Sequence, residues 1–433
     1  MVEHLVLGAG MAGLGAAHRF RDAGHDALLV DRRDHLGGHA STKVADGFVF
    51  DEGPHVSFTR DERLQALFAD GVDGRYETLK TRVDNHWRGH WIKHPAPCNL
   101  HGLPTDLVVD IVRDFVAARD ADPSQATHYA DWLIATYGRT FAETFPMVYG
   151  KKYHTADARD MTTDWLGPRL YRPSLDEVLR GALEPETPDV HYVDHFRYPT
   201  DGGFVAFLRK LAAASTIELE REVVSIDPRQ RSVRFAGGRS IDYRHLISSL
   251  PLPELIARIE GTPREVVEAA GRLACTVCVL VDLGVDREDV GTAHWTYVYD
   301  EDIVFTRLSA PHRFSPNTVP DGASSLQAEL YFSDKYRPLT VEPASLLEPT
   351  VRDLRRLGLL RDDDRLLHRD VRVVQYANII FDHDRQPALD LVFGYLDELG
   401  IATCGRYGRW GYQWTDESFV SGENAARAVL DRG

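Results

Sequence analysis

The sequence predicts an α/β protein (α+β overall) with a Rossmann-like domain, a helical insertion and an antiparallel-sheet domain. Three observations predict this class. A strand, a glycine-rich turn, a helix and a second strand open the chain, and amphipathic helical spacing prevails in residues 61–190. Alternating apolar segments fill residues 272–335. We expect a discontinuous first domain (1–60, 195–252 and 370–433), a mainly helical domain (61–194) and an antiparallel-sheet domain (253–369).

The composition is that of a globular enzyme. At 433 residues, the chain is too long for one simple core. It is 43% hydrophobic and 27% charged, and it contains no low-complexity tract. The net charge of -16 argues against a non-specific grip on nucleic acid or on anionic lipid, because both need clustered Lys and Arg. We therefore expect neither nucleic-acid nor membrane partners, and we leave the oligomeric state open.

The N-terminus and the cysteines exclude further classes. The chain enters an apolar strand at once, and no window reaches the roughly 18 apolar residues of a membrane helix, so we expect a cytoplasmic protein. Cys275 and Cys278 lie in a strand-like run, where alternation places the thiols on opposite faces or nearly so. No second cysteine pair completes a zinc site, and we expect no bound metal.

Residues 3–31 carry the pattern of a dinucleotide site. Gly8 permits the tight turn, Gly10 lets the backbone approach a pyrophosphate at the helix N-terminus, and Gly13 lets the helix lie close to the strand. Asp31 ends the second strand, where a carboxylate can accept hydrogen bonds from a ribose diol. The predicted cofactor-binding residues here are Gly8, Gly10, Met11, Ala12, Gly13, Asp31 and Arg32.

The segment after Asp31 favours FAD over NAD. A second glycine pair, Gly37-Gly38, follows shortly after the acid and leads into His39, Ala40 and Ser41. In flavoproteins similar to the amine oxidase and glutathione reductase type, this run supports the FAD pyrophosphate. We therefore predict that Gly38, His39 and Ala40 also contact FAD.

Distinctive sequence blocks lie along most of the chain. The most specific is the run Gly405-Arg-Tyr-Gly-Arg-Trp-Gly-Tyr412. The other blocks, in order, are Gly8 to Gly13, Gly53-Pro-His55, Trp91 to Pro95 with Asn99-Leu100, Trp165 to Arg169, Tyr198 to Gly203, Phe305-Thr-Arg307, Phe314 to Pro316, Asp334-Lys-Tyr336 and Tyr376. Together, in this order, they resemble the UDP-galactopyranose mutase family, most closely its eukaryotic-type members.

The resemblance implies a redox-neutral ring contraction of a nucleotide sugar. In this family the N5 atom of reduced flavin attacks the anomeric carbon, and NAD(P)H or another reductant supplies the electrons. The implied catalytic residues are Arg169 and Arg307 on the diphosphate, Tyr376 and Tyr412 beside them, and His55 at the flavin. The implied FAD contacts are Gly53, Pro54, His55, Val223, Gly405, Arg406, Tyr412, Asp416 and Ser418.

Local departures leave the substrate open. Ala96 and Pro97 stand where the eukaryotic members carry Phe and Gln beside the uridine, and Phe58 replaces a second loop histidine of bacterial members. The main alternative is an FAD oxidoreductase similar to amine or protoporphyrinogen oxidases, acting on a sugar, amine or alcohol. A non-catalytic flavin-binding scaffold is a third hypothesis. Two guanidinium groups in the substrate site would favour the mutase hypothesis, because an apolar substrate cannot pair with them and their burial costs free energy.

Overall fold

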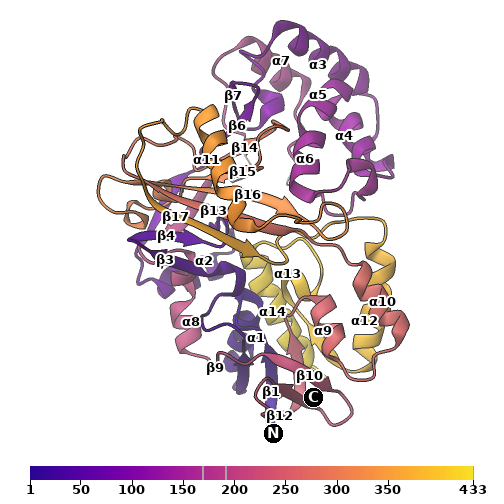
Figure 1. Cartoon of the computed structure of the whole chain (residues 1–433). Coiled ribbons are helices and arrows are strands. Elements are labelled where there is room, and N and C mark those ends of the chain that lie inside the picture. The colour runs from indigo at the N-terminus through magenta and orange to yellow at the C-terminus, as the bar shows by residue number, and fades with distance from the viewer. Residues whose placement is uncertain (168–169, 191–192, 433) are drawn as a thin grey trace.

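The computed structural model describes residues 1–167, 170–190 and 193–432. A Rossmann-like region carries both termini at one end of the molecule, a second sheet lies in the middle, and a group of helices lies at the far end (Figure 1). The predicted fold class is therefore confirmed: a parallel-rich Rossmann-like sheet is combined with a mainly antiparallel sheet. None of the helices in the described ranges is both long enough and apolar enough to cross a bilayer.

The first sheet is built around the N-terminal strand, which is fully buried from Leu5 to Leu7. It runs parallel to a neighbour on each side, so the carboxyl ends of these strands meet at one edge, where ligands bind in such folds. The strands, in spatial order, are β10 (Val223–Asp227), β11 (Ser232–Phe235), β12 (Ser240–Ser248), β1 (Val2–Leu7), β2 (Ala27–Val30) and β9 (Thr216–Glu218), with β18 (Ile401–Thr403) also paired with β12.

Two helices from opposite ends of the chain pack tightly on this sheet. They are α1 (Met11–Asp22) and α14 (Thr415–Leu430). A Cβ on Gly15 would lie 2.1 Å from the carbonyl oxygen of Phe419, and one on Gly422 would lie 1.9 Å from that of Ala12. The two backbones therefore approach so closely that only glycine fits, and the last residues of the chain close the domain that the first residues begin.

The second sheet takes strands from distant parts of the chain. Its strands, in spatial order, are β17 (Leu366–Val374), β13 (Val277–Val285), β16 (Ser324–Phe332), β15 (Arg307–Ser309), β14 (Trp295–Val298), β6 (Val83–Trp87) and β7 (His90–Lys93). All pairs are antiparallel except β14 with β6. Strands β6 and β7 come from the segment expected to be mainly helical, and β17 crosses residue 369; the division into domains stays a prediction.

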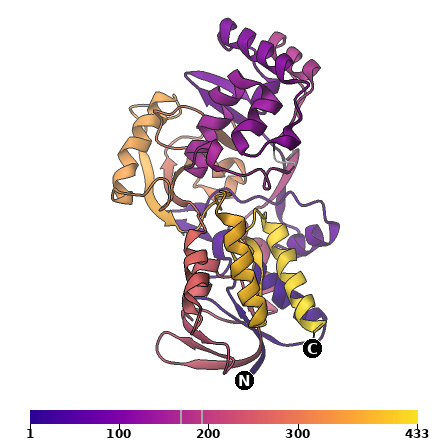
Figure 2. The ribbon, with the colours of Figure 1, turned by 90° about the vertical axis from the view of Figure 1, so that its right-hand side faces the viewer.

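The remaining elements cover the sheets. Strands β3 (Thr42–Ala45) and β4 (Phe48–Asp51) form a hairpin, and β5 (Tyr76–Lys80) pairs with β8 (His195–Pro199). The other helices are α2 (Glu62–Gly71), α3 (Thr105–Ala118), α4 (Tyr129–Tyr137), α5 (Arg139–Thr144), α6 (Pro146–His154), α7 (Leu175–Leu183), α8 (Arg209–Ala213), α9 (Leu252–Arg258), α10 (Arg264–Arg272), α11 (Leu347–Arg356), α12 (Arg385–Glu398) and α13 (Gly405–Gly408). Figure 2 shows α10, α12 and α14 as a row on one face of the Rossmann-like region.

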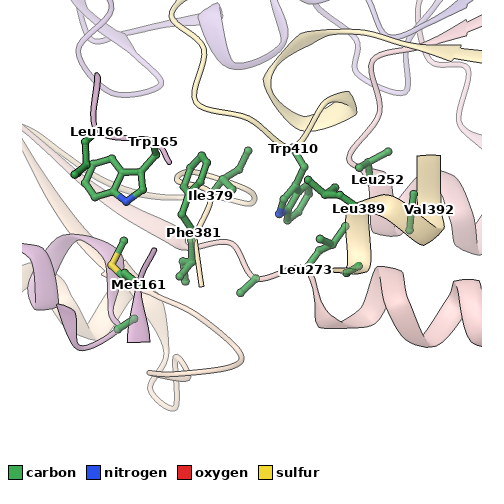
Figure 3. Packing of buried hydrophobic residues seen from close by; sticks show 14 of the residues in the cluster. Met161, Trp165, Leu166, Leu252, Leu273, Ile379, Phe381, Leu389, Val392 and Trp410 are labelled. Atoms are coloured by element: carbon green, nitrogen blue, oxygen red, sulfur yellow. The ribbon is translucent and has the colours of Figure 1, made fainter. Parts of the chain in front are cut away.

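One continuous core connects the helical group to the C-terminal helices. Phe381 lies against Trp165, with ring centroids 6.1 Å apart, and the N–H of Thr162 donates to the Phe381 carbonyl at 2.7 Å. Ile379 and Phe381 lie between Trp165 on one side and Trp410 on the other (Figure 3). The segment after β17 therefore joins the helical group to the turn around Trp410.

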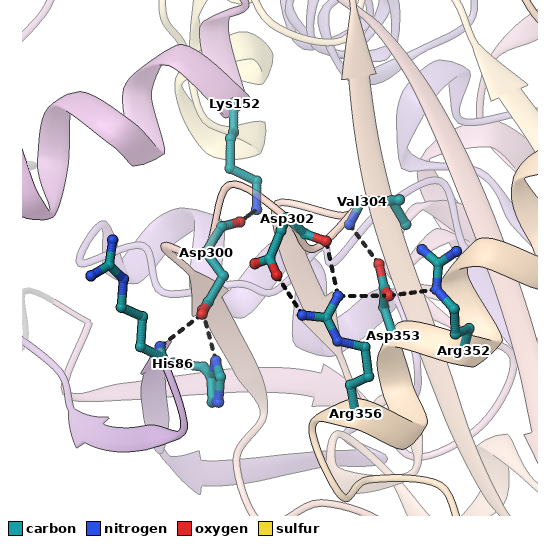
Figure 4. A network of polar contacts seen from close by, with 9 residues as sticks. His86, Lys152, Asp300, Asp302, Val304, Arg352, Asp353 and Arg356 are labelled. Carbon is teal, nitrogen blue, oxygen red and sulfur yellow. Dashed lines mark hydrogen bonds and ion pairs between the residues drawn. The ribbon is translucent and has the colours of Figure 1, made fainter.

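A buried lysine fastens the helical group to the second sheet. Lys152, on α6, donates to the carbonyl oxygens of Val298, Asp300 and Phe305 at 3.2, 2.6 and 2.8 Å. The carboxylate of Asp300 accepts from His86 at 2.8 Å (Figure 4). These bonds hold the connection between β14 and β15, and β15 begins two residues beyond Phe305.

Lys152→Met should lower the free energy of unfolding by about 2–5 kcal/mol, because it removes the donor to these buried carbonyl groups. Chemical denaturation followed by tryptophan fluorescence measures this loss. Lys151→Met is the matched control, since Lys151 is the exposed neighbour on the same helix and should change stability by less than about 0.5 kcal/mol. Equal losses in the two variants would contradict the assigned role of Lys152.

Candidate active site

A cavity of about 540 Å³ lies between the carboxyl edge of the first sheet and the face of the second. It is lined by the β1–α1 turn and the end of β2 on one side, and by β13, β15 and β16 on the other. The volume lies within the range of small-molecule sites. This is the edge at which a dinucleotide was predicted to bind.

Most of the predicted site residues line this cavity. They are Gly8, Gly10, Met11, Ala12, Asp31, Arg32, Gly38, His39, Ala40, Gly53, Pro54, His55, Val223, Arg307, Tyr376, Gly405, Arg406, Tyr412 and Ser418. Gly13 does not line it. Its role is the close packing that was predicted, because a Cβ there would lie 1.9 Å from the carbonyl oxygen of Gly8. Arg169 lies outside the described residues.

Asp416 departs from its predicted position at FAD. It lines a separate hollow with Arg409 and Asp397, whereas Thr415 and Ser418 of the same helix line the cavity. Each residue of an α-helix turns by about 100°, so the residue after Thr415 points away from the cavity. The N-terminus of α14 still reaches the site through its neighbours.

The glycine turn leaves room and donors for a pyrophosphate. Gly8 has a φ of +104°, and a Cβ there would lie 2.2 Å from the hydroxyl oxygen of Ser249. Gly10 is the N-cap of α1 and has no side chain to occupy the first-turn N–H groups. These donors and the helix dipole are the parts that bind a phosphate anion. The residues present therefore fit the pyrophosphate of a dinucleotide.

Two carboxylates order the segments around this turn. Asp31 accepts from the backbone N–H of Ala9 at 2.8 Å, so it fixes the turn and has lone pairs left for a ribose. Glu52 binds Arg33 at 2.8 Å and His39 at 3.1 Å. Burial would raise the pKa of Glu52, but these two partners hold it at about 2. The ion-paired cluster keeps the Gly37-Gly38 loop in place beside the cavity.

His55 offers a neutral imidazole to the cavity. Its Nδ1 lies 3.0 Å from the carbonyl oxygen of Gly53, which can only accept, so Nδ1 carries the proton. Burial lowers the pKa of His55 to about 4, so the ring is neutral at pH 7. In this tautomer Nε2 is an acceptor. His55 can therefore take up a proton or orient a donor at Nε2.

Arg307 is held from one side by an acid that the sequence reasoning missed. It begins β15 directly opposite Glu329 on β16, and its Nε and Nη2 donate to the two carboxylate oxygens at 2.7 and 2.8 Å. The hydroxyl of Tyr331 donates to the same carboxylate. Among the described residues, Nη1 of Arg307 has no partner. The guanidinium group is thus fixed in orientation and keeps two N–H groups for a ligand.

Aromatic rings and a second cation complete the cavity wall. Arg406 lies over the ring of Tyr412 at 4.5 Å, and its Nη2 donates to Asn378 at 3.0 Å. Its Nε is buried without a partner in the described chain. Tyr376 contacts Tyr407 and Trp410, rather than the rings around Arg307. Tyr376 and Arg307 therefore line the same cavity, but the ring contacts of Tyr376 are to other residues of its wall.

Strand alternation could have found the residues that were missed. The cavity is also lined by Tyr153, by Tyr297 on β14, and by Glu329 and Tyr331 on β16. Glu329 and Tyr331 are two residues apart, and the alternation of a strand places them on the same face. The opposition of Arg307 to Glu329 depends on strand register, which the sequence pattern did not show.

Acidification should destabilise the protein. Burial lowers the pKa of His55, His294 and His312 to about 4, and that of His154 to about 3. Their pKa in the unfolded chain is about 6.5, so between pH 6.5 and 4 the unfolded state binds more protons. The free energy of unfolding should therefore keep its full value above pH 6.5 and fall by several kcal/mol toward pH 4. Each group contributes about 1.4 kcal/mol per pH unit to this fall.

Denaturant titrations at pH 7.5, 6 and 5 measure this dependence. Asp51, Asp84 and Asp282 act in the opposite direction, because burial raises their pKa, that of Asp51 to about 6. The histidines outnumber them, since burial also lowers the pKa of His4 to about 4. His55→Gln should show a weaker dependence, whereas the exposed-site variant His35→Gln should keep it in full. A free energy of unfolding that is equal or higher at pH 5 would contradict the prediction.

A glycine turn and an open helix N-terminus beside this cavity define a dinucleotide-binding protein as the class. The sequence agrees: it matches the flavin-containing amine oxidoreductase family over residues 11–430, and the chain belongs to that family. FAD is the cofactor that membership of this family implies.

Individual relatives differ in what they are named for. The 4,4'-diapolycopene oxygenase of a Methylomonas species is 25% identical over 416 residues, which are 82% of this chain and 81% of that protein. The 15-cis-phytoene desaturase of Narcissus pseudonarcissus is 40% identical over 78 residues, only 18% of this chain and 14% of that protein.

Solved structures share the whole architecture. A reduced UDP-galactopyranose mutase has a TM-score of 0.93 at 23% identity, covering 100% of this chain and 96% of its own. A putative protoporphyrinogen oxidase from Exiguobacterium sp. 255-15 has a TM-score of 0.79 at 15% identity, covering 100% and 99%. At such identities the likeness establishes the fold.

Proposed function

We propose that this flavin-dependent enzyme is a nucleotide-sugar pyranose/furanose mutase that acts with reduced FAD. The observation that carries the proposal is Arg307, which lies in the cavity wall with one edge bound to Glu329 and Nη1 left for a ligand. A planar guanidinium group held in this way suits a phosphate oxygen. The likeness in fold to a reduced UDP-galactopyranose mutase supports the same hypothesis.

The polar groups around Arg307 favour a polar substrate. Tyr153, Tyr297 and Tyr331 line the cavity near Arg307, and Arg406 lies in its wall. Buried hydroxyl and guanidinium groups cost free energy unless a ligand or the protein satisfies them. The three hydroxyl groups already bond to Asn378, Trp295 and Glu329, so Nη1 of Arg307 is the group that a ligand would satisfy. A sugar diphosphate can accept from it, whereas a hydrocarbon cannot. The cavity wall around Arg307 therefore fits a nucleotide sugar better than a carotenoid.

The residues of this chain have separable roles in the proposed reaction. Bound reduced FAD would supply a nucleophilic nitrogen at its N5 position. Arg307 would hold and neutralise the diphosphate as it leaves, and neutral His55 would accept or return a proton at Nε2. Arg406 would place positive charge in the wall of the same cavity.

An oxidoreductase is the second candidate, and a specific observation favours it. The relative that matches over 82% of the chain is named as a 4,4'-diapolycopene oxygenase, and the family is named for amine oxidoreductases. In that case the oxidised flavin would accept a hydride from a substrate in the same cavity. The two hypotheses differ in the flavin oxidation state that is active.

The deciding experiment compares both oxidation states. Dithionite-reduced enzyme, kept free of oxygen, is incubated with UDP-, GDP- and dTDP-hexoses, and the products are separated by anion exchange. Oxidised enzyme is separately given the same sugars, amines, alcohols and a detergent-dispersed carotenoid while the flavin absorbance is followed. The variant Arg307→Ala is the control for the mutase reaction.

The mutase hypothesis predicts an isobaric product from one nucleotide sugar, formed only by the reduced enzyme and lost in Arg307→Ala. If no sugar is isomerised while an amine, an alcohol or the carotenoid bleaches the oxidised flavin, the mutase hypothesis fails and the enzyme is an oxidoreductase.

A further inference from the structure

Two histidines and a glutamate gather at the amino end of the first sheet, away from the cavity. Glu3 and His4 lie on β1, and His25 lies between the end of α1 and the start of β2. The cavity lies at the carboxyl edge of this sheet, whereas the N-terminus lies at the opposite, lower end in Figure 1. This cluster is therefore separate from the flavin site.

The imidazole ring of His4 is buried without hydrogen bonds. His4 is 3% exposed, and neither of its ring nitrogens has a partner in the described chain. A buried polar atom without a partner costs about 1–3 kcal/mol, and an unseen water or ion is a common reason for one. The ring packs between Phe20 at 4.0 Å and His245 at 5.3 Å, so it is held in one orientation.

His25 is held close to this ring by the end of α1. Its backbone N–H donates to the carbonyl oxygen of Phe20 at 2.9 Å, and its ring lies edge-on to His4 with centroids 5.5 Å apart. Neither ring nitrogen of His4 has a partner among the described residues, so the His4 imidazole can offer a lone pair to a ligand. Two imidazoles thus converge at the end of a helix.

The third group is the carboxylate of Glu3. One ligand atom from each of Glu3, His4 and His25 lies within 4.8 Å of the others. Ligands on a tetrahedral ion lie about 3.4 Å apart, so the cluster would have to contract slightly. It can do so because Glu3 is exposed and His25 is only partly buried. At present Glu3 lies 3.6 Å from Arg244, a contact that an ion would replace.

We propose that Glu3, His4 and His25 form a binding site for one divalent transition-metal ion of the Zn²⁺ type, with water in the fourth position. Neutral imidazoles with one carboxylate form a ligand set of zinc proteins. The ion would clamp the start of β1 to the turn between α1 and β2. Its role is structural, and it does not depend on the proposed function. It also differs from our expectation of no metal, which considered only the cysteines.

The test uses the purified flavoprotein after removal of metal with a chelator. Zn²⁺ is titrated by calorimetry, and the melting temperature is measured with and without Zn²⁺. His25→Ala is the main variant, since His25 is partly exposed and its loss should leave the fold intact. His35→Ala is the matched control, because His35 is an exposed histidine paired with Asp34 and remote from the cluster. FAD content is measured in every sample.

The proposal predicts one Zn²⁺ per chain, a higher melting temperature with Zn²⁺, and affinity weakened at least tenfold in His25→Ala but unchanged in His35→Ala. Glu3→Gln should weaken binding to a smaller extent. Absence of binding, or equal binding by His25→Ala and the wild type, would overturn it. FAD content should stay constant, so failure here is distinct from failure of the proposed function.

Discussion

Arg307→Lys should lower the turnover of the enzyme on its substrate about a hundredfold while the fold and the FAD content are retained. The guanidinium group binds both oxygens of Glu329 through Nε and Nη2 and still presents Nη1 to the cavity. A lysine keeps the charge, so Glu329 is not left unpaired. Its single ammonium group cannot bind Glu329 at two points and a ligand in the fixed orientation at the same time. Turnover is measured on the substrate that the experiment with reduced and oxidised enzyme identifies.

Arg372→Lys is the matched control for this change. Arg372 also pairs with a buried carboxylate of the second sheet, donating to Asp282 at 2.7 Å, but it does not line the cavity. Its replacement should alter the melting temperature and leave turnover within about twofold. If Arg307→Lys also stays within that range, Arg307 does not contact the substrate.

Gly422→Ala should destabilise the first domain by about 3 kcal/mol or more, with loss of bound FAD. The added Cβ would lie 1.9 Å from the carbonyl oxygen of Ala12, a backbone atom that cannot move without displacing α1. Because the first turn of α1 borders the cavity, separating α1 from α14 also opens the predicted cofactor site. The ratio of FAD to protein and the melting temperature measure the two effects.

Gly271→Ala is the control for the effect of replacing a helical glycine that has no close neighbour. Gly271 lies in α10, and a Cβ there would have no atom within 4 Å. Alanine favours a helix over glycine by about 1 kcal/mol, so this variant should be unchanged or slightly more stable. If Gly422→Ala retains FAD and melts with the wild type, the close helix contact does not control the site.

The sequence predicted the parts of the fold that depend on local pattern. The glycines of the first turn and the acidic end of β2 could be assigned because each has a short-range physical cause. The strands in residues 61–194 were harder to predict from the sequence. Strands β6 and β7 are short, and only pairing with β14 makes them part of the second sheet.

For the site, sequence determined which segments face the cavity, and tertiary structure decided what their residues do there. Gly8 and Asp31 were predicted from the local strand, turn and helix pattern, and His55 and Arg406 from the family resemblance; all four line the cavity. The pairing of Arg307 with Glu329 depends on strand register, and the outward position of Asp416 depends on how α14 is rotated. Both are set by packing between distant segments, which no local pattern specifies.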